Sequence, residues 1–260
     1  MKYKKFIKIA VFGLIAALLF CFCSCGDEKT DASNLSVKTP QGYYQTAFLG
    51  DSLTDKGVYK ELITTHYTDY LYENCSFIKN VQNVGYAGSC IAGLPDKAGK
   101  MSPSFIERYK QIKNDTDLII VFGGTNDYGI GSSTLPNPLG SESDTTEETF
   151  YGALKILIEG IKTDYPAAKI VFVTPVFRAE QEVNGIPNNN KYGFTLEDYV
   201  SAIIDVCNKN SVSVIDAFHE LDEINAYTYN EYEVDGLHLN NEGNVLLGKF
   251  LKAKLSEILD

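Results

Sequence analysis

Segments with the patterns of strands and helices alternate along most of this chain. Residues 117–122 (Asp-Leu-Ile-Ile-Val-Phe) form a nearly continuous apolar run that ends in two glycines, as expected of a strand buried on both faces. Residues 146–165 instead carry apolar side chains at helical spacing, with Pro166 just beyond them. In all, we predict strands at 44–49, 77–84, 117–122, 169–173 and 212–217, and helices at 56–72, 146–165, 196–209 and 241–259. This alternation predicts an α/β domain in which a parallel sheet lies between two layers of helices.

The first residues have the layout of an export signal. Four lysines lie within residues 2–8, and residues 9–23 then carry no charge. This uncharged run is short for a bilayer-spanning helix. The run ends in Cys23-Ser24-Cys25, which resembles a bacterial lipoprotein signal with Cys25 as the lipidated first residue. An ordinary cleaved signal would instead release the protein freely. We therefore predict a signal peptide at 1–24, a flexible polar tether at 25–42 and one domain at 43–260, held at the cell envelope.

Charge and cysteine content exclude several classes of protein. The sequence has 23 basic and 34 acidic residues and a net charge of −11; removing residues 1–24 takes away four lysines and no acid, which leaves −15. Nucleic acid is therefore an unsuitable partner, and we expect membrane contact only through the lipid anchor. Of the six cysteines only Cys75, Cys90 and Cys207 lie in the domain, so a disulfide framework is excluded, while a bond between Cys75 and Cys90 stays open. The domain has no CxxC pair and no HExxH, and we expect no metal site.

Three short segments that could supply catalytic groups follow predicted strands directly. They are Gly50-Asp51-Ser52-Leu53, residues 83–88 (Asn-Val-Gly-Tyr-Ala-Gly) and Gly124-Thr125-Asn126-Asp127. Because parallel strands end at one edge of a sheet, the three segments should gather there. Ser52 can be a nucleophile that also offers its N–H to an oxyanion, or it can merely cap a helix. Gly88, with Gly85 as the alternative, can present a second N–H and the Asn126 amide a third donor, although each segment could also be only a turn.

A serine nucleophile needs a base, and the chain has three histidines: His66, His219 and His238. His66 lies in the first predicted helix and lacks a comparably placed acid. The other two occur in Asp-x-x-His sequences, with Asp216 and Asp235 as the acids. Asp216 ends the last predicted strand, so geometry alone leaves its pair open. We favour Asp235 and His238, because they lie in a tight loop directly before the last helix, whereas His219 precedes an acidic stretch of irregular sequence.

Together these segments resemble the four blocks of the GDSL family of serine hydrolases, also called SGNH hydrolases. The resemblance spans residues 47–245 and rests on Gly50-Asp51-Ser52-Leu53, Gly88, Gly124-x-Asn126-Asp127 and Asp235-x-x-His238. It implies a flavodoxin-like three-layer α/β/α sandwich with a five-stranded parallel sheet and no cofactor. It also implies that Ser52 is the nucleophile, His238 the base and Asp235 its orienting acid, with an oxyanion hole made by Ser52, Gly88 and Asn126. Ser89 stands where many members have an acidic residue, so Gly85 remains an alternative to Gly88.

The family hydrolyses many kinds of ester, so the substrate must be inferred from the loops. Residues 129–149, 178–194 and 225–233 are polar, and tyrosine and asparagine are frequent among them. None of them resembles a long apolar lid for an acyl chain. We therefore expect a small-molecule or glycan ester as partner, and favour O-acetyl esters of carbohydrates. The alternatives are a lysophospholipase, lipase or thioesterase that acts on longer acyl chains, and a non-catalytic glycan-binding surface lipoprotein. The sequence does not indicate an oligomeric state.

Overall fold

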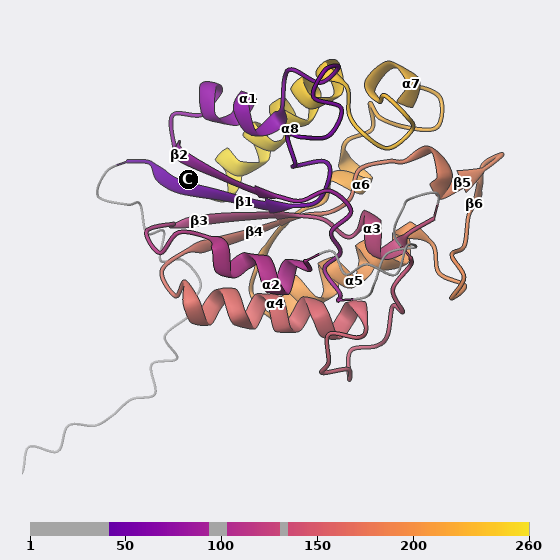
Figure 1. Cartoon of the computed structure of the whole chain (residues 1–260), viewed down its shortest axis with the longest axis horizontal. Helices are drawn as coiled ribbons and strands as arrows, with labels where there is room; N and C mark the ends of the chain where they lie inside the picture. Colours follow the sequence, from indigo (N-terminus) through magenta and orange to yellow (C-terminus); the bar gives the residue numbers. More distant parts are fainter. Residues whose placement is uncertain (1–41, 94–102, 131–134, 260) are drawn as a thin grey trace, which may run out of the picture. The chain divides into compact units, whose positions relative to one another are not determined.

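The computed structural model describes residues 42–93, 103–130 and 135–259 (Figure 1). The predicted signal peptide, the Cys25 lipidation site and almost all of the tether lie outside these residues. No helix in the described part of the chain is long and apolar enough to cross a membrane.

A five-stranded parallel sheet forms the centre of the domain, in the order β2-β1-β3-β4-β7. Its strands are β1 (Tyr44–Gly50), β2 (Ile78–Gly85), β3 (Leu118–Phe122), β4 (Lys169–Val173) and β7 (Ser213–Ile215). All five residues of the central strand β3 are buried, as its apolar sequence predicts. Strand β2 lies on one side of β1, and the later strands β3, β4 and β7 follow on the other side, so the strand order reverses between β1 and β3. In sheets of this type, ligands bind beyond the carboxyl ends of the strands at that point.

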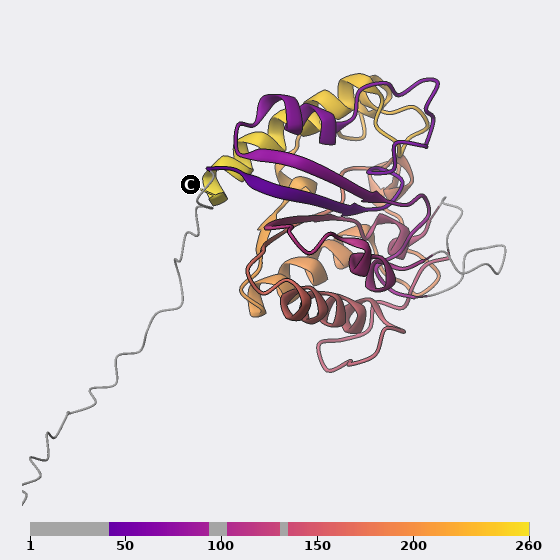
Figure 2. The same ribbon diagram turned by 60° about the vertical axis from the view of Figure 1, so that its left-hand side comes forward.

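Helices cover both faces of the sheet (Figures 1 and 2). One layer contains α1 (Tyr67–Asn74) and α8 (Asn241–Leu259), and the opposite layer contains α2 (Phe105–Arg108), α4 (Phe150–Asp164) and α5 (Leu196–Lys209). The remaining short elements are η1 (Tyr109–Gln111), α3 (Thr125–Tyr128), η2 (Ala179–Gln181), β5 (Glu182–Val183), β6 (Ile186–Pro187), α6 (Ala217–Glu220) and α7 (Tyr229–Tyr232). Strands β5 and β6 pair antiparallel in a separate hairpin. The predicted three-layer α/β/α sandwich is confirmed.

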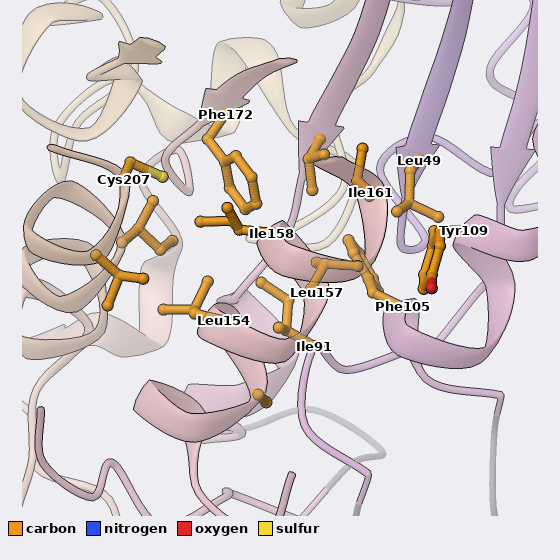
Figure 3. Packing of buried hydrophobic residues seen from close by; sticks show 14 of the residues in the cluster. Leu49, Ile91, Phe105, Tyr109, Leu154, Leu157, Ile158, Ile161, Phe172 and Cys207 are labelled. Atoms are coloured by element: carbon orange, nitrogen blue, oxygen red, sulfur yellow. The ribbon is translucent and has the colours of Figure 1, made fainter. Parts of the chain in front are cut away.

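Two hydrophobic cores result from the alternation of side chains along the strands. Phe48 packs with the α1 and α8 layer, whereas its neighbour Leu49 packs with the α2, α4 and α5 layer. In the second core, α4 directs a stripe of four fully buried side chains at the sheet, where Figure 3 shows them beside Phe105 and Phe172: Leu154, Leu157, Ile158 and Ile161. Their spacing places them on one helix face, which is why the helix could be predicted from the sequence.

Two predictions about local structure need correction, and one question that the sequence left open is answered. The helix expected at 56–72 is confined to Tyr67–Asn74, and turns occupy most of residues 51–62. Within this stretch, Asp55 accepts a hydrogen bond from the N–H of Gly57 (2.8 Å), and Tyr59 has a left-handed φ of 47°. The last strand ends at Ile215 instead of residue 217, because Asp216 caps helix α6. Cys75 and Cys90 are buried free thiols, so the disulfide that the sequence left open is not formed.

Candidate active site

Ser52 lies in a tight turn directly after β1. The side chain of Asp51 accepts the N–H of Leu53 (2.9 Å), and its carbonyl accepts the N–H of Thr54 (3.1 Å). Gly50 permits this turn, because a Cβ at that position would lie 1.9 Å from Oγ1 of Thr54. Burial raises the pKa of Asp51 to about 6. The turn therefore fixes the position of the Ser52 hydroxyl at the carboxyl edge of the sheet.

A chain of hydrogen bonds joins Ser52, His238 and Asp235. Oγ of Ser52 lies 2.9 Å from Nε2 of His238, and Nδ1 of the same ring lies 2.8 Å from Oδ2 of Asp235. These two residues come from the loop between α7 and α8, which is 186 residues away from Ser52 in sequence. The structure thus brings together the three residues that the sequence singled out as nucleophile, base and orienting acid.

Asp235 is held by several donors besides the imidazole. The main-chain N–H groups of Leu237 (3.1 Å) and His238 (2.8 Å) donate to Oδ1, and the hydroxyl of Tyr59 donates to Oδ2 (2.9 Å). Burial acts to raise the pKa of Asp235, but the hydrogen bonds from His238 and Tyr59 outweigh it and lower the pKa below its ordinary value. The ring of Tyr59 also meets that of His238 edge to face, with 5.5 Å between the centroids. Asp235 is therefore an oriented carboxylate, and Tyr59 is a contact that sequence reasoning missed.

The other two histidines have different surroundings. Nδ1 of His219 lies 2.7 Å from Oδ2 of Asp216, and its Nε2 lies 3.5 Å from Glu197. Burial opposes charging of this ring, but the two carboxylates outweigh it and raise the pKa of His219. His219 is half exposed and does not line the pocket that contains Ser52. His66 precedes α1, and burial lowers its pKa.

Gly88, Asn126 and Ser52 line one pocket, as the predicted oxyanion hole requires. Gly88 has a left-handed φ of 74°, and neither its N–H nor that of Ser52 has a hydrogen-bond partner among the described residues. Asn126 directs its amide towards the same loop and donates one N–H to the carbonyl of Ser89 (3.0 Å). Gly85 differs, since its N–H donates to Oδ1 of Asn83 (2.8 Å). The geometry therefore favours Gly88 over Gly85 as a donor.

Two buried charged groups support this loop. Arg108 of α2 donates to the carbonyls of Gly50 (2.9 Å) and Val84 and to Oγ of Ser89 (2.8 Å), so it links the ends of β1 and β2 to the Gly88 turn. Ser89 is therefore the partner of an arginine where many members of the resembled family have an acid. No pattern in the sequence indicated this role for Arg108.

The second group is Asp127, which lies next to Asn126. Its carboxylate accepts the main-chain N–H groups of Ile91 and Ala92, both at 2.9 Å, and the side-chain amide of Asn137 at 2.7 Å. Burial raises the pKa of Asp127 to about 7. Through these hydrogen bonds Asp127 holds the segment that follows Gly88 against the end of β3.

The pocket over the Ser52 hydroxyl has a volume of about 370 Å³. It is lined by Ser52, Val58, Tyr59, Ala87, Gly88, Asn126, Arg178, Glu180, Asp235, Leu237 and His238. Arg178 is fully buried and donates to the carbonyl (3.0 Å) and Oγ1 (3.1 Å) of Thr125, and Glu180 lies 3.7 Å from its guanidinium. Neither residue was predicted as part of the site, although both lie in one of the polar segments expected to shape it. Within the described residues, no group of three or more His, Cys, Asp or Glu side chains could hold a metal ion.

These features place the protein among hydrolases built on a flavodoxin-like α/β sandwich. The model of the GDSL-like lipase/acylhydrolase family matches residues 48–246, and the chain belongs to this family. A protein of known structure from Lactobacillus plantarum is 29% identical, with a TM-score of 0.70, over 83% of this chain and 97% of that one.

More distant structures share the fold. A candidate lipase from Chitinophaga pinensis is 22% identical, with a TM-score of 0.61, over 83% of this chain and 99% of that one. A candidate GDSL-like lipase from Bacteroides uniformis is 19% identical, with a TM-score of 0.58, over 84% and 97% of the two chains. No functionally curated protein matches the chain significantly.

Proposed function

We propose that this protein is a serine esterase that hydrolyses carboxylic esters through Ser52, His238 and Asp235. The observation that carries the proposal is the hydrogen-bonded chain from Oγ of Ser52 through the His238 ring to Asp235, beside the N–H groups of Ser52 and Gly88 and the Asn126 amide. This is the set of groups that acyl transfer through a serine requires.

The proposed reaction has two stages. His238 takes the proton of Ser52 while the hydroxyl oxygen attacks the ester carbonyl, and Asp235 stabilises the imidazolium that forms. The N–H groups of Ser52 and Gly88 and the amide of Asn126 donate to the oxyanion of the tetrahedral intermediate. His238 then protonates the departing alcohol, which leaves an acyl group on Ser52. Water then attacks this acyl group while the same histidine takes a proton from the water, and the histidine passes that proton to Oγ of Ser52 as the carboxylic acid leaves. No step uses a metal or an organic cofactor.

We further propose O-acetyl esters of carbohydrates as the substrates. The pocket walls carry polar side chains, among them Asn126, Asp235 and the partly exposed Glu180. A long acyl chain would gain little beside Glu180 and Asp235, because it would desolvate these carboxylates without offering them partners. An acetyl group is small, and the hydroxyls of a sugar can bond to a carboxylate and an amide.

We also propose that the protein acts at the cell envelope. The lysine-rich start, the uncharged run at 9–23 and the Cys23-Ser24-Cys25 sequence support export and lipidation of Cys25. A membrane-anchored form labelled by a fatty acid and lost on Cys25→Ala would agree with this proposal. Release of the unaltered protein into the medium would favour the freely secreted alternative.

Three variants test the catalytic assignment. We expect Ser52→Ala and His238→Ala each to lower the turnover of p-nitrophenyl acetate by at least about a thousandfold, because nucleophile and base act as a unit. His219→Ala is the matched control, since it removes the other histidine of an Asp-x-x-His sequence, and it should keep the activity of the unaltered protein. Loss of activity in His219→Ala would contradict the choice of base. A wild-type protein that hydrolyses no ester would favour a non-catalytic binding role.

The substrate class is tested by a series of p-nitrophenyl esters of increasing acyl length, run beside acetate release from acetylated glycans. We expect kcat/KM to be highest for acetate and to fall as the chain lengthens. A value that rises towards chains of about eight carbons or more would instead indicate a lipase or lysophospholipase.

A further inference from the structure

A second cavity lies next to the catalytic pocket, and we call it the outer groove. Its volume is about 420 Å³, which is within the range of small-molecule sites. The residues that matter here are Phe177, Ala179, Glu182, Asn184, Tyr227 and Tyr229. They come from the segment after β4, from the β5–β6 hairpin and from the region where α7 begins, with Tyr227 two residues before that helix. Figure 1 shows these elements beyond the carboxyl ends of the strands.

The outer groove and the catalytic pocket share one wall. Along residues 177–180, Phe177 and Ala179 line the outer groove, whereas Arg178 and Glu180 line the catalytic pocket. The N–H of Ala179 donates to the carbonyl of Gly236 (2.7 Å), so this wall is fixed to the loop that carries the Asp235 carboxylate. The two cavities therefore lie on opposite sides of one wall, and only a ligand that passes over this wall occupies both.

Aromatic rings give the outer groove the character of a sugar-binding surface. The rings of Phe177 and Tyr229 lie 6.0 Å apart at an angle of 32°, and Tyr227 is 95% exposed. Tyr227 is nevertheless held in place at its backbone, because its N–H donates to Oδ1 of Asn225 (2.9 Å). An aromatic side chain exposed at the surface is available for a ligand that is apolar on one face and polar at its rim, as a sugar ring is.

The charges around the outer groove limit which sugars it can bind. Glu182 and Asn184 supply a carboxylate and an amide for hydroxyl groups, and no lysine or arginine lines the cavity in the described part of the chain. The chain as a whole has a net charge of −11. A glycan that carries carboxylates of its own would be repelled, whereas a neutral one would not.

We propose that the outer groove binds the sugar units of a neutral glycan that follow the esterified sugar in the catalytic pocket. This inference rests on the proposed function, because it assumes that an acetylated carbohydrate reaches Ser52. It adds a binding site for the polymer chain and predicts that the enzyme distinguishes oligosaccharides by length.

The test is acetate release from singly acetylated neutral oligosaccharides of increasing length, from one sugar unit to five. We expect kcat/KM to rise with length in the unaltered protein. In Tyr227→Ala, the ratio of kcat/KM between the longest and the shortest substrate should fall about tenfold, as for loss of one well-placed aromatic contact. Tyr72→Ala is the matched control, because Tyr72 is an exposed tyrosine (48%) on α1 and does not line the groove, so it should keep the ratio. Thermal unfolding of both variants checks that their folds are retained.

The possible outcomes separate this inference from the proposed function. A length ratio near one in the unaltered protein, with deacetylation intact, overturns the outer groove alone, as does an unchanged ratio in Tyr227→Ala. Hydrolysis of p-nitrophenyl acetate without acetate release from any oligosaccharide overturns the carbohydrate proposal, and the outer groove with it. If kcat/KM rises equally with length for oligosaccharides of uronic acids, the assignment to neutral glycans is contradicted.

Discussion

At the scale of single residues, the contact between Tyr59 and Asp235 decides how the carboxylate acts on His238. The Tyr59 hydroxyl donates to the same oxygen, Oδ2, that lies nearest Nδ1 of His238. A donor at that oxygen takes up part of the negative charge that would otherwise stabilise the imidazolium. The hydroxyl therefore helps to keep Asp235 ionised and oriented, while the Tyr59 ring contacts the imidazole edge to face.

We predict that Tyr59→Phe lowers kcat/KM. Phenylalanine keeps the ring but removes a hydrogen bond that orients Asp235 and helps to lower its pKa. We expect kcat/KM at neutral pH to fall about three- to tenfold, the size of one hydrogen bond to a charged group. The measurement is kcat/KM for p-nitrophenyl acetate between pH 5 and 9.

The control for this variant is Tyr192→Phe, which removes a hydroxyl from an exposed tyrosine outside the catalytic pocket. It should leave the rate unchanged. An unchanged kcat/KM in Tyr59→Phe would contradict this role of the hydroxyl.

The residues of the site differ in how far the sequence could indicate them. Ser52, Asn126, Asp235 and His238 belong to short segments whose spacing has a chemical reason, and the structure brings them to one pocket. Tyr59 lies 176 residues from Asp235 in sequence, and nothing in its own neighbourhood points to that contact. Such long-range pairs depend on the course of the turns at 51–62, which side-chain periodicity does not describe.

At the scale of elements, Arg108 connects α2 with two strands and a turn. It is 2% exposed, and burial lowers its pKa to about 10. Its guanidinium donates to main-chain carbonyls at the ends of β1 and β2, and the first of these, that of Gly50, also accepts the N–H of Tyr86 (3.1 Å). The helix, although only four residues long, thus fixes the distance between the Ser52 turn and the Gly88 turn.

We predict that Arg108→Met lowers both stability and activity. The variant removes the buried hydrogen bonds that the guanidinium donates to the carbonyls of Gly50 and Val84 and to Oγ of Ser89, which should cost about 3 kcal/mol of unfolding free energy. It should also lower kcat, because the N–H of Gly88 is then less well placed for an oxyanion. Urea denaturation and p-nitrophenyl acetate turnover measure the two effects. Lys110→Met is the control: it removes an exposed cation two residues away and should change neither, whereas equal behaviour of the two variants would contradict this role of Arg108.

The elements themselves were predictable where apolar periodicity and capping agree. The helix at Leu196–Lys209 begins and ends as predicted, and Thr195 caps it with a capping box formed with Asp198. The helix expected at 56–72 was wrong at its start, because Asp55, Gly57 and the left-handed Tyr59 favour turns over a continuous helix. The β5–β6 hairpin was not predicted either, since strands of two residues have no periodicity to detect.

At the scale of the whole molecule, burial of acidic groups links stability to pH. Besides Asp51 and Asp127, Glu233 is buried, and neither of its carboxylate oxygens has a partner among the described residues. Burial raises the pKa of Glu233 to about 8, and the charge of Asp235 adds to the effect. Groups of this kind favour the folded state most at a pH below their ordinary pKa, near 4, and this contribution is lost as the pH rises through the folded value.

Other groups oppose this trend only at lower pH. His66 has a lowered pKa, so its contribution is lost as the pH falls below its ordinary value of 6.5. Asp235 also has a lowered pKa, and its contribution is lost below its ordinary value of 3.8. Between pH 6.5 and 8 the loss comes from the buried carboxylates and from His219, whose raised pKa acts in the same direction. Glu233, with the highest pKa of the three carboxylates, carries the largest share.

We predict that the domain loses stability from pH 6.5 to 8 and that Glu233→Gln largely removes this loss. Glutamine has nearly the shape of the protonated side chain but does not ionise. Residue 233 therefore no longer makes the unfolding free energy of the variant depend on pH. The melting temperature of the unaltered protein should fall by roughly 5 °C over this range, given the few degrees per kcal/mol typical of a domain of this size. Glu231→Gln, an exposed neighbour on α7, is the control and should follow the unaltered protein. A melting temperature that falls equally in Glu233→Gln would show that the Glu233 carboxyl is already ionised in the folded state, with a counter-charge or water beside it that offsets its burial.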